Sequence, residues 1–475
     1  MRCMRLALIG ALGWGCFHMT TSAEAASAGR DLYMEKCASC HGERLQGGNA
    51  QSLVDGIWQF GSDRGYIVRN IKYGIPHLGM PSYEKTLTDP QISLIVDFLR
   101  DSERQAGAKP PAPPKELETL DYYIKVEIWA EGFAVPWSID WLDLRRALVT
   151  ERPGRLRLVE DGKMHPKPIA GTPQVLGEGQ GGLLDVAVDP NYAKEGWVYL
   201  AYSHALDKGT GSGGIVSMTR IVRGRIKDHA WVDEQVVYEA PRESYRTTRH
   251  HYGCRIVFDP QGYLYFGIGD RGVGADAQDL GRPNGKIHRI HRDGSIPKDN
   301  PFVNRQGALP TIFSYGHRNP QGLAVHLETG RVWETEHGPM GGDELNLISP
   351  GLNYGWPEVT YGLDYDGTVI SKLREKPGMQ VPNYYWRPSP ALCGLDFYRG
   401  RLFAKWNNHL LNGALRYEQV ELLDIEQDRV IHVETILKNA GRVRDVACGP
   451  DGAIYVVLNR PDIILRLTPT GEKLP

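Results

Sequence analysis

The chain has 475 residues, a formal net charge of −2 at pH 7, and 55 glycines and 31 prolines. This length allows more than one domain, and the many glycines and prolines are typical of a turn-rich fold. The near balance of acidic and basic residues excludes a strongly basic surface of the kind that binds nucleic acids, so we expect no nucleic-acid partner.

Residues 1–25 have the features of a secretory signal peptide. Arg2 and Arg5 precede a short apolar stretch, and Ala23-Glu24-Ala25 offers small residues for cleavage. The apolar stretch is too short to span a bilayer comfortably, and no later stretch reaches transmembrane length. The sequence therefore predicts an exported, periplasmic protein that does not span a membrane.

A C-x-x-C-H motif follows at Cys37-Ala38-Ser39-Cys40-His41. In this motif the two thiols form thioethers with haem vinyl groups, and the histidine binds the iron. A zinc or redox C-x-x-C is the alternative, but the chain has no second C-x-x-C that would complete a zinc site. Cys37, Cys40 and His41 therefore predict a covalently attached haem c.

The pattern over 26–104 is helical and compact. Met80 lies in a proline-flanked loop and is the predicted sixth ligand of the haem iron, with His77 as its rival. After Thr88-Asp89-Pro90, a helix is predicted from apolar residues at helical spacing: Ile92, Ile95, Val96 and Leu99. Over its full length this stretch resembles class I cytochromes c, which implies an all-α cytochrome c domain.

Residues 105–120 form a proline-rich linker, and from about 121 to 475 the chain turns to short strands separated by glycine, proline and aspartate. An apolar run, an Asp-Pro or Pro-Asp-Gly turn and a second apolar run recur, for example at Arg255–Ile268. The copy count predicts an all-β six-bladed β-propeller. We expect the strand near Ile124–Trp129 to join the last blade and close the ring.

Three cysteines remain for this second domain: Cys254, Cys393 and Cys448. Their odd number argues against a disulfide framework, although two of them could form one disulfide in an oxidising compartment.

Several short motifs in the propeller place polar residues beside strands. Glycine-flanked Gln180 precedes one strand and allows close approach of a ligand to the backbone. His250 and His251 stand at the start of another strand. An imidazole is suited to proton transfer near neutral pH. Because side chains alternate along a strand, we expect His250 to point away from His251. Glu336–Glu344 is a further motif whose Asp-Glu pair is, on its residues alone, more typical of a solvated loop than of a metal site.

Arginines are the other recurrent feature. Arg318 stands in Gly316-His317-Arg318-Asn319-Pro320, and a guanidinium is a natural partner of a carboxylate. Alternation places Arg442 and Arg444 on one face of a strand. Two arginines on an apolar strand are costly to bury without anions, so they predict an anionic ligand.

Together these motifs resemble, over nearly all of Tyr122–Pro475, the soluble pyrroloquinoline quinone (PQQ)-dependent glucose/sorbosone dehydrogenases, also called aldose sugar dehydrogenases. The resemblance implies that His251 is the general base and that the carbonyls of Gly338 and Pro339 hold the cofactor's calcium. It implies PQQ contacts from Gln180, Arg318, Asn319, Arg442, Arg444 and Arg416, the last in place of a family lysine. It also implies a second calcium or supporting site formed by Asp343, Glu344 and Tyr354.

The resemblance implies a quinohaemoprotein dehydrogenase with PQQ, haem c and Ca²⁺. Its propeller would oxidise an aldose or a related sugar aldehyde or alcohol and pass electrons to the haem. The haem would then reduce a soluble cytochrome or the respiratory chain. The alternatives are a calcium-dependent lactonase-type propeller, which needs a carboxylate-rich metal centre on the axis, and a non-catalytic binding propeller.

Overall fold

The computed structural model describes residues 22–48, 50–56, 58, 64–75, 79–107, 112–206, 214–365 and 367–473. The chain divides into two compact units, Met1–Pro110 and Pro111–Pro475. Most of the predicted signal peptide and the rival haem ligand His77 lie outside the described residues. The end of that peptide falls in the first turn of the first helix.

The first unit is helical, as predicted. Its helices are α1 (Ser22–Lys36), α2 (Ala38–His41), α3 (Arg64–Tyr73) and α4 (Asp89–Ala106). Helix α4 begins at a capping box in which Thr88 and Gln91 satisfy each other's backbone N–H groups. The apolar face predicted for this helix is buried: Ile92, Ile95, Val96 and Leu99. This face packs with Tyr33 and Ile71 into one apolar core, and burying it stabilises a helix that is marginal alone.

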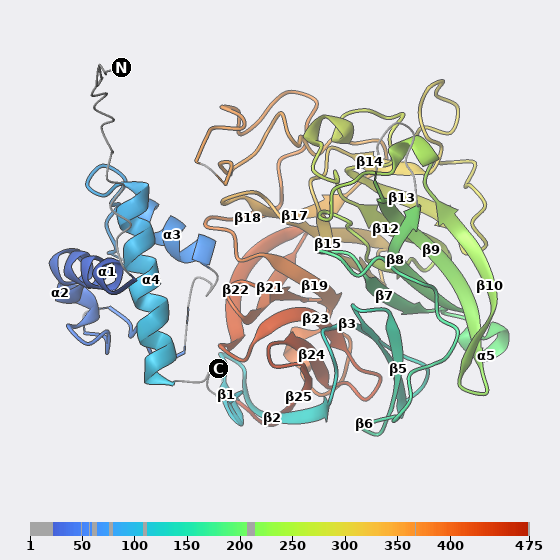
Figure 1. Cartoon of the computed structure of the whole chain (residues 1–475). Helices are drawn as coiled ribbons and strands as arrows, with labels where there is room; N and C mark the ends of the chain where they lie inside the picture. The colour runs from blue at the N-terminus through green and yellow to red at the C-terminus, as the bar shows by residue number, and fades with distance from the viewer. Residues whose placement is uncertain are drawn as a thin grey trace, which may run out of the picture. The chain divides into compact units, whose positions relative to one another are not determined.

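The second unit is a six-bladed propeller, which confirms the predicted fold (Figure 1). Five of its sheets have four antiparallel strands each. They are β3 (Pro136–Trp141), β4 (Arg146–Glu151), β5 (Arg155–Glu160) and β6 (Lys163–Met164); β7 (Leu183–Val188), β8 (Val198–Leu206), β9 (Val216–Lys227) and β10 (Ala230–Glu239); β11 (Ile256–Phe258), β12 (Tyr263–Ile268), β13 (Lys286–His291) and β14 (Ile312–Tyr315); β15 (Pro320–His326), β16 (Arg331–Glu336), β17 (Asp343–Ile348) and β18 (Tyr384–Trp386); and β19 (Leu392–Phe397), β20 (Leu410–Ala414), β21 (Gln419–Glu426) and β22 (Arg429–Lys438).

The last sheet joins the two ends of the propeller. It contains β23 (Arg442–Cys448), β24 (Ile454–Asn459), β25 (Ile463–Glu472), β2 (Tyr122–Glu131) and β1 (Glu116–Glu118). Strand β2 pairs with β25 from Tyr122↔Glu472 to Glu131↔Ile463, so the strand predicted near Ile124–Trp129 does close the ring. Strand β1 lies inside the predicted linker, so the propeller begins earlier than expected.

The first strand of each sheet lies at the centre of the ring, where β3, β7, β11, β15, β19 and β23 contact one another in turn. Apolar side chains fill the space between neighbouring sheets. One cluster joins Tyr199 and Ile221 of the second sheet to Leu264 and Phe266 of the third. Because each sheet is covered on both faces, its strands are almost continuously buried, as in β7.

Three short helices, η2 (Arg242–Ser244), η3 (Gly274–Ala277) and η4 (Ala404–Trp406), and α5 (Tyr192–Glu195) lie in the connections of the propeller. Within the described part of the chain, no helix has both the length and the apolar character needed to cross a membrane. Cys254, Cys393 and Cys448 are all free thiols in this structure.

Candidate functional site

The first unit contains a cavity of about 960 Å³. The thiols of Cys37 and Cys40, the ring of His41 and the thioether of Met80 all border it. The rest of the lining is largely apolar: Tyr33, Leu53, Trp58, Ile67, Ile71, Ile75, Tyr83, Ile95 and Leu99. The structure thus brings the two predicted iron ligands and both predicted thioether positions to one cavity, and this set of residues fits a haem c.

His41 is oriented by its own backbone neighbours. The motif forms one helical turn, in which the N–H of His41 donates to the carbonyl of Cys37 at 3.0 Å. The ring Nδ1 lies 2.8 Å from the carbonyl of Gln51. A histidine whose Nδ1–H binds a carbonyl has Nε2 free for a metal, so this contact selects the tautomer that iron requires.

We expect Met80→Ala to lower the reduction potential of the haem by on the order of 0.1 V, because a thioether ligand favours ferrous iron. A redox titration of the full-length protein measures this change. Met34→Ala is the matched control, since Met34 is 36% exposed on α1 and does not border the cavity. An unchanged potential in Met80→Ala would exclude Met80 as the ligand.

In the propeller, the predicted residues gather at one end of the ring. Gln180, His251 and Arg318 each precede the first strand of a sheet, and Arg442 begins one. The second strand of a sheet runs antiparallel to the first, so the loop after it returns to the same end. The loops after β12, β16 and β20 carry the remaining polar residues described below.

His251 is paired with Asp270, which follows β12. The ring Nδ1 of His251 donates to Oδ1 of Asp270 at 2.7 Å, and Oδ2 of Asp270 accepts from the indole N–H of Trp356 at 2.8 Å. The backbone N–H of His251 donates to Oε1 of Gln180 at 2.8 Å. The imidazole is therefore fixed at its backbone and at Nδ1, so that Nε2 is the nitrogen available to accept a proton.

Burial, and next the positive charge of Arg318, lower the pKa of His251 to about 4 against the opposing effect of Asp270. Burial acts to raise the pKa of Asp270, but the hydrogen bond and charge of His251 and the charge of Arg318 hold it below its ordinary value. At neutral pH the pair therefore consists of a neutral imidazole and a carboxylate, which is the state a general base needs.

The prediction that His250 points away from His251 is wrong. The two ring centroids lie 4.7 Å apart in an edge-to-face arrangement. Neither residue is in a strand, because β11 begins only at Ile256, and His251 has a φ of 55°. The alternation argument fails in such a turn.

Arg318 and Asn319 contact the two neighbouring loops, those of His337–Gly338 and of His251–Gly253. Nη1 of Arg318 donates to the carbonyls of His337 and Gly338 at 3.0 and 2.9 Å. Oδ1 of Asn319 accepts from the backbone N–H of Gly253, two residues after His251, at 3.2 Å. Nε of Arg318 is buried with no hydrogen-bond partner among the described residues. The guanidinium is close enough to His251 for its charge to lower the pKa of that histidine.

Arg444 shows the same feature two blades further round the ring, on β23. Its Nε is also buried without a partner in the described part of the chain, while Nη1 lies 3.8 Å from Sγ of Cys393. The β23–β24 register is irregular between Val443 and Asp445, so simple alternation does not relate Arg444 to Arg442. Arg416 is 3% exposed and donates from Nη1 to the carbonyl of Ser389 at 3.2 Å.

The predicted calcium carbonyls lie after β16. The carbonyl of Gly338 accepts from Arg318, and that of Pro339 accepts from Oγ of Ser389 at 3.3 Å. Because a carbonyl oxygen has two lone pairs, each can still coordinate a cation. Asp343 supports this loop: its Oδ1 accepts from the N–H of Gly338 at 2.9 Å.

The three residues predicted for a second calcium or supporting site have separate surroundings. Asp343 and Glu344 are consecutive on β17, so their side chains leave opposite faces. Both oxygens of Asp343 are engaged by backbone N–H groups. The hydroxyl of Tyr354 donates to the carbonyl of Leu347 at 2.6 Å. Glu344 stands opposite Glu336 in the β16–β17 register.

Two residues of the site were missed by sequence reasoning. Asp270 stands between glycines, in Gly269-Asp270-Arg271-Gly272, directly after a strand, which was the available signal. Glu336 ends β16, and its Oε2 accepts from the backbone N–H of Asn319 at 3.2 Å. No spacing rule connects either residue with its partner 17 or more positions away, because each contact joins the segment before one strand to the end of the next strand in the same sheet.

Comparison with known proteins gives the same two parts. The family described as glucose / sorbosone dehydrogenase matches residues 133–466, and that described as cytochrome C oxidase, cbb3-type, subunit III matches residues 24–99. The aldose sugar dehydrogenase YliI of Escherichia coli K12 is 38% identical over 354 residues, which are 73% of this chain and 93% of that protein.

Solved structures resemble the propeller. A glucose dehydrogenase crystal structure is 40% identical with a TM-score of 0.68, and covers 72% of this chain and 99% of its own. The PQQ-bound aldose sugar dehydrogenase of Streptomyces coelicolor is 27% identical with a TM-score of 0.59, and covers 75% and 99%. The chain thus belongs to the glucose/sorbosone dehydrogenase family, with a cytochrome c domain in front of its propeller.

Proposed function

We propose that this protein is a periplasmic quinohaemoprotein that oxidises an aldose or a related sugar aldehyde or alcohol and passes the electrons to its own haem c. The observation that carries the proposal is the convergence of the His251–Asp270 pair with the side chains of Arg318 and Arg444 at one end of the ring. A proton acceptor near the buried Arg318 and the partly buried Arg444 fits a hydroxyl substrate together with an anionic cofactor.

The residues at this end of the ring fit PQQ with calcium. Its carboxylates and quinone oxygens would be held by the residues that the sequence predicted, namely Gln180, Arg318, Asn319, Arg416, Arg442 and Arg444. The carbonyls of Gly338 and Pro339 would hold the calcium, which prefers oxygen ligands. PQQ, when bound, supplies a two-electron acceptor for hydride.

The side chains then have distinct tasks. His251 takes the proton of the sugar hydroxyl at Nε2 as the neighbouring carbon is oxidised. Asp270 holds the ring through Nδ1 and stabilises the imidazolium that forms. Trp356 fixes Asp270 through its indole N–H. This division of roles requires a neutral His251 at the working pH, which its lowered pKa provides.

The charged residues on the axis of the propeller favour a dehydrogenase over a lactonase. The carboxylates of Asp185 and Asp445 lie there, but both pair with the guanidinium of Arg255, at 3.1 and 3.0 Å. A cationic side chain thus occupies the position between the carboxylates that a lactonase-type metal would need. The paired base and the haem cavity have no role in a purely binding propeller.

The test is the absorbance of the haem in full-length protein to which PQQ, Ca²⁺ and a panel of aldoses are added. We expect reduction only when all three are present. Because a sugar gives two electrons and a haem takes one, about half an equivalent of sugar will reduce all of the haem. Protein that oxidises sugar with an artificial dye but never reduces its haem would overturn the intramolecular transfer.

Localisation is part of the proposal and has its own measurement. Haem attachment through Cys37 and Cys40 and the predicted signal peptide both support export to the periplasm. Fractionation of cells that express the full chain is expected to place the haem-stained protein in the periplasmic fraction, with residues 1–25 absent from its N-terminal peptide.

A further inference from the structure

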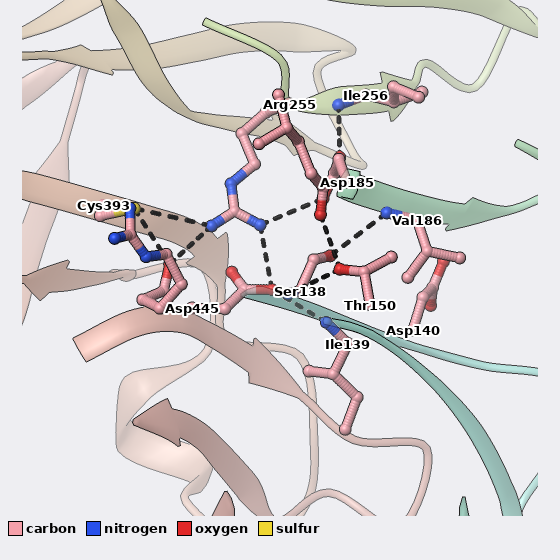
Figure 2. Close-up of polar contacts among 12 residues, drawn as sticks. Ser138, Ile139, Asp140, Thr150, Asp185, Val186, Arg255, Ile256, Cys393 and Asp445 are labelled. Atoms are coloured by element: carbon pink, nitrogen blue, oxygen red, sulfur yellow. Dashed lines mark hydrogen bonds and ion pairs between the residues drawn. The ribbon is translucent and has the colours of Figure 1, made fainter. Parts of the chain in front are cut away.

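One arginine at the centre of the propeller contacts all five of the other blades. Arg255 immediately precedes β11, and its guanidinium lies among the innermost strands (Figure 2). Its contacts are Asp185 on β7 at 3.1 Å, Asp445 on β23 at 3.0 Å, the carbonyl of Gln321 on β15 at 3.1 Å, the carbonyl of Arg444 on β23 at 2.7 Å, Sγ of Cys393 on β19 at 3.8 Å and the ring of Trp137 on β3 at 4.3 Å.

The charge of Arg255 is fully buried and fully paired. The residue is 5% exposed, and Asp185 and Asp445 are 3% and 6% exposed. A buried guanidinium is stable only when its donors are satisfied and its charge is compensated. Here Nε, Nη1 and Nη2 each have an oxygen acceptor, and those acceptors come from three different blades. A lysine could not serve them, because it lacks the planar fork.

The two aspartates depend on this cation. Burial raises the pKa of Asp445 to about 7 even though Arg255 opposes the shift. Burial likewise raises the pKa of Asp185 against the opposing effect of Arg255. Without the guanidinium, these two buried carboxyl groups from different blades would lose their counter-charge.

Arg255 also ends the segment that carries the predicted base. Within His251–Cys254, three residues have positive φ angles: 55° at His251, 66° at Gly253 and 116° at Cys254. Two of these are not glycine, so the backbone is strained and must be held by its surroundings. Gln180 holds the segment at His251, Asn319 holds it at Gly253, and the side chain of Arg255 anchors its end.

The same guanidinium holds the strand of a predicted cofactor ligand. Nη2 donates to the backbone carbonyl of Arg444, at the point where the β23–β24 register is irregular. Arg255 therefore connects the strained loop of His251 with the backbone of Arg444 through one rigid group. Arg255 is the side chain that contacts both the end of the His251 loop and the backbone of Arg444, whereas Gln180 and Asn319 hold only the loop.

We propose that Arg255 is a positioning residue of the dehydrogenase site. It fixes the position of His251 relative to Arg444 across the axis of the ring. This inference rests on the proposed function, since it assigns Arg255 to the same site. A positioning role and a purely structural role predict different results. If Arg255 positions the site, its loss must lower kcat and PQQ affinity more than the loss of another ion pair between blades does.

Arg292 and Asp189 provide the matched control. Nη1 of Arg292, which follows β13, binds Asp189 after β7 at 2.5 Å, and Asp189 is 2% exposed. The pair joins the second and third blades, but it lies beyond the far ends of β7 and β13, away from the starts of the inner strands. Arg292→Met therefore removes a partly buried ion pair between blades without touching the site.

The experiment compares Arg255→Met, Arg255→Lys and Arg292→Met in the full-length protein with PQQ and Ca²⁺. Three quantities are measured: the melting temperature, the affinity for PQQ by equilibrium dialysis, and kcat and KM with an artificial dye as acceptor. We expect Arg255→Met to weaken PQQ binding at least about tenfold and to lower kcat about a hundredfold with little change in the sugar KM, because misplacing reacting groups by about 1 Å costs this much.

Arg255→Lys keeps the charge and loses the fork, so we expect PQQ affinity near that of the wild type and kcat lowered about tenfold. Arg292→Met should lower the melting temperature and leave kcat and PQQ affinity unchanged. If Arg255→Met does not fold, the lysine variant decides the question, and its full activity would overturn the proposal.

Other outcomes are equally decisive. Losses of kcat and PQQ affinity in Arg255→Met no greater than those in Arg292→Met would reduce Arg255 to a structural ion pair. Wild-type protein that neither binds PQQ nor oxidises any sugar would overturn the proposed function, and this inference with it. Active wild-type protein with an unaffected Arg255→Lys variant overturns this inference alone.

Discussion

Replacing His251 by glutamine is expected to lower kcat for sugar oxidation about a thousandfold, because positioned general bases contribute factors of this size. The sugar KM should change little, because a general base acts mainly in the transition state of the chemical step. The measurement uses PQQ-loaded, full-length protein and a dye acceptor, so that the haem plays no part. His165→Gln is the control, because His165 is exposed, its Nδ1 contacts only the backbone of Lys167, and its ring packs against His229 away from the predicted site residues. A kcat within tenfold of the wild type would exclude His251 as the base.

The pH dependence has a defined sign. Burial and then Arg318 lower the pKa of His251 from about 6.5 to about 4, so kcat/KM should stay level from neutral pH downward and fall only as the pH passes about 4. Asp270→Asn removes the charge that favours imidazolium, so it should move this acidic limb to lower pH. It should also lower kcat about a hundredfold or more, because the amide no longer enforces the Nδ1–H tautomer.

The same lowered pKa affects stability. Below about pH 6.5 the unfolded chain protonates His251 while the folded protein does not, down to about pH 4. The free energy of unfolding should therefore decrease as the pH falls from about 6.5 to about 4, because protonation of His251 then favours the unfolded chain. His251→Gln should flatten the dependence of the melting temperature on pH in this window.

The double substitution of Cys37 and Cys40 by serine is expected to abolish covalent haem and, with it, all electron transfer to a cytochrome acceptor. Sugar oxidation with an artificial dye should be retained in full, because the propeller is a separate compact unit. Haem-stained gels and the two activities, measured side by side, check both statements.

Cys448→Ser is the matched control for this experiment. Cys448 is a free, partly exposed thiol in the last blade, so its loss should change neither haem content nor activity. Retained reduction of a cytochrome acceptor in the Cys37/Cys40 variant would mean that electrons leave the propeller by another route.

Most of the fold was predictable because short stretches of neighbouring residues indicate its elements. The haem motif lies within five consecutive residues, and the apolar spacing of Ile92, Ile95, Val96 and Leu99 reports the buried face of α4 directly. Blade strands carry their own turn signals, so their repeated pattern predicts six sheets. The strand that closes the ring was predictable because a propeller needs a partner for its last sheet.

The site was predictable only where its residues stand in motifs beside strands. His251, Arg318 and Arg444 are of this kind, and their types already indicate proton transfer and anion binding. The relation between them was not predictable, and alternation misled where the backbone leaves the strand: His250 lies against His251 because a φ of 55° replaces extended geometry.

By itself, then, the sequence determined the two domains, the haem motif and the identities of the charged residues that the site could use, since each is encoded within a few neighbouring positions. Only the tertiary structure decided that Asp270 orients His251 and that Arg255 joins six blades. Both contacts form when segments distant in sequence converge at one end or on the axis of the ring. The first contact joins the two loops that flank the β11–β12 hairpin, and the second depends on the packing of all six sheets. No short pattern of residues contains either geometry.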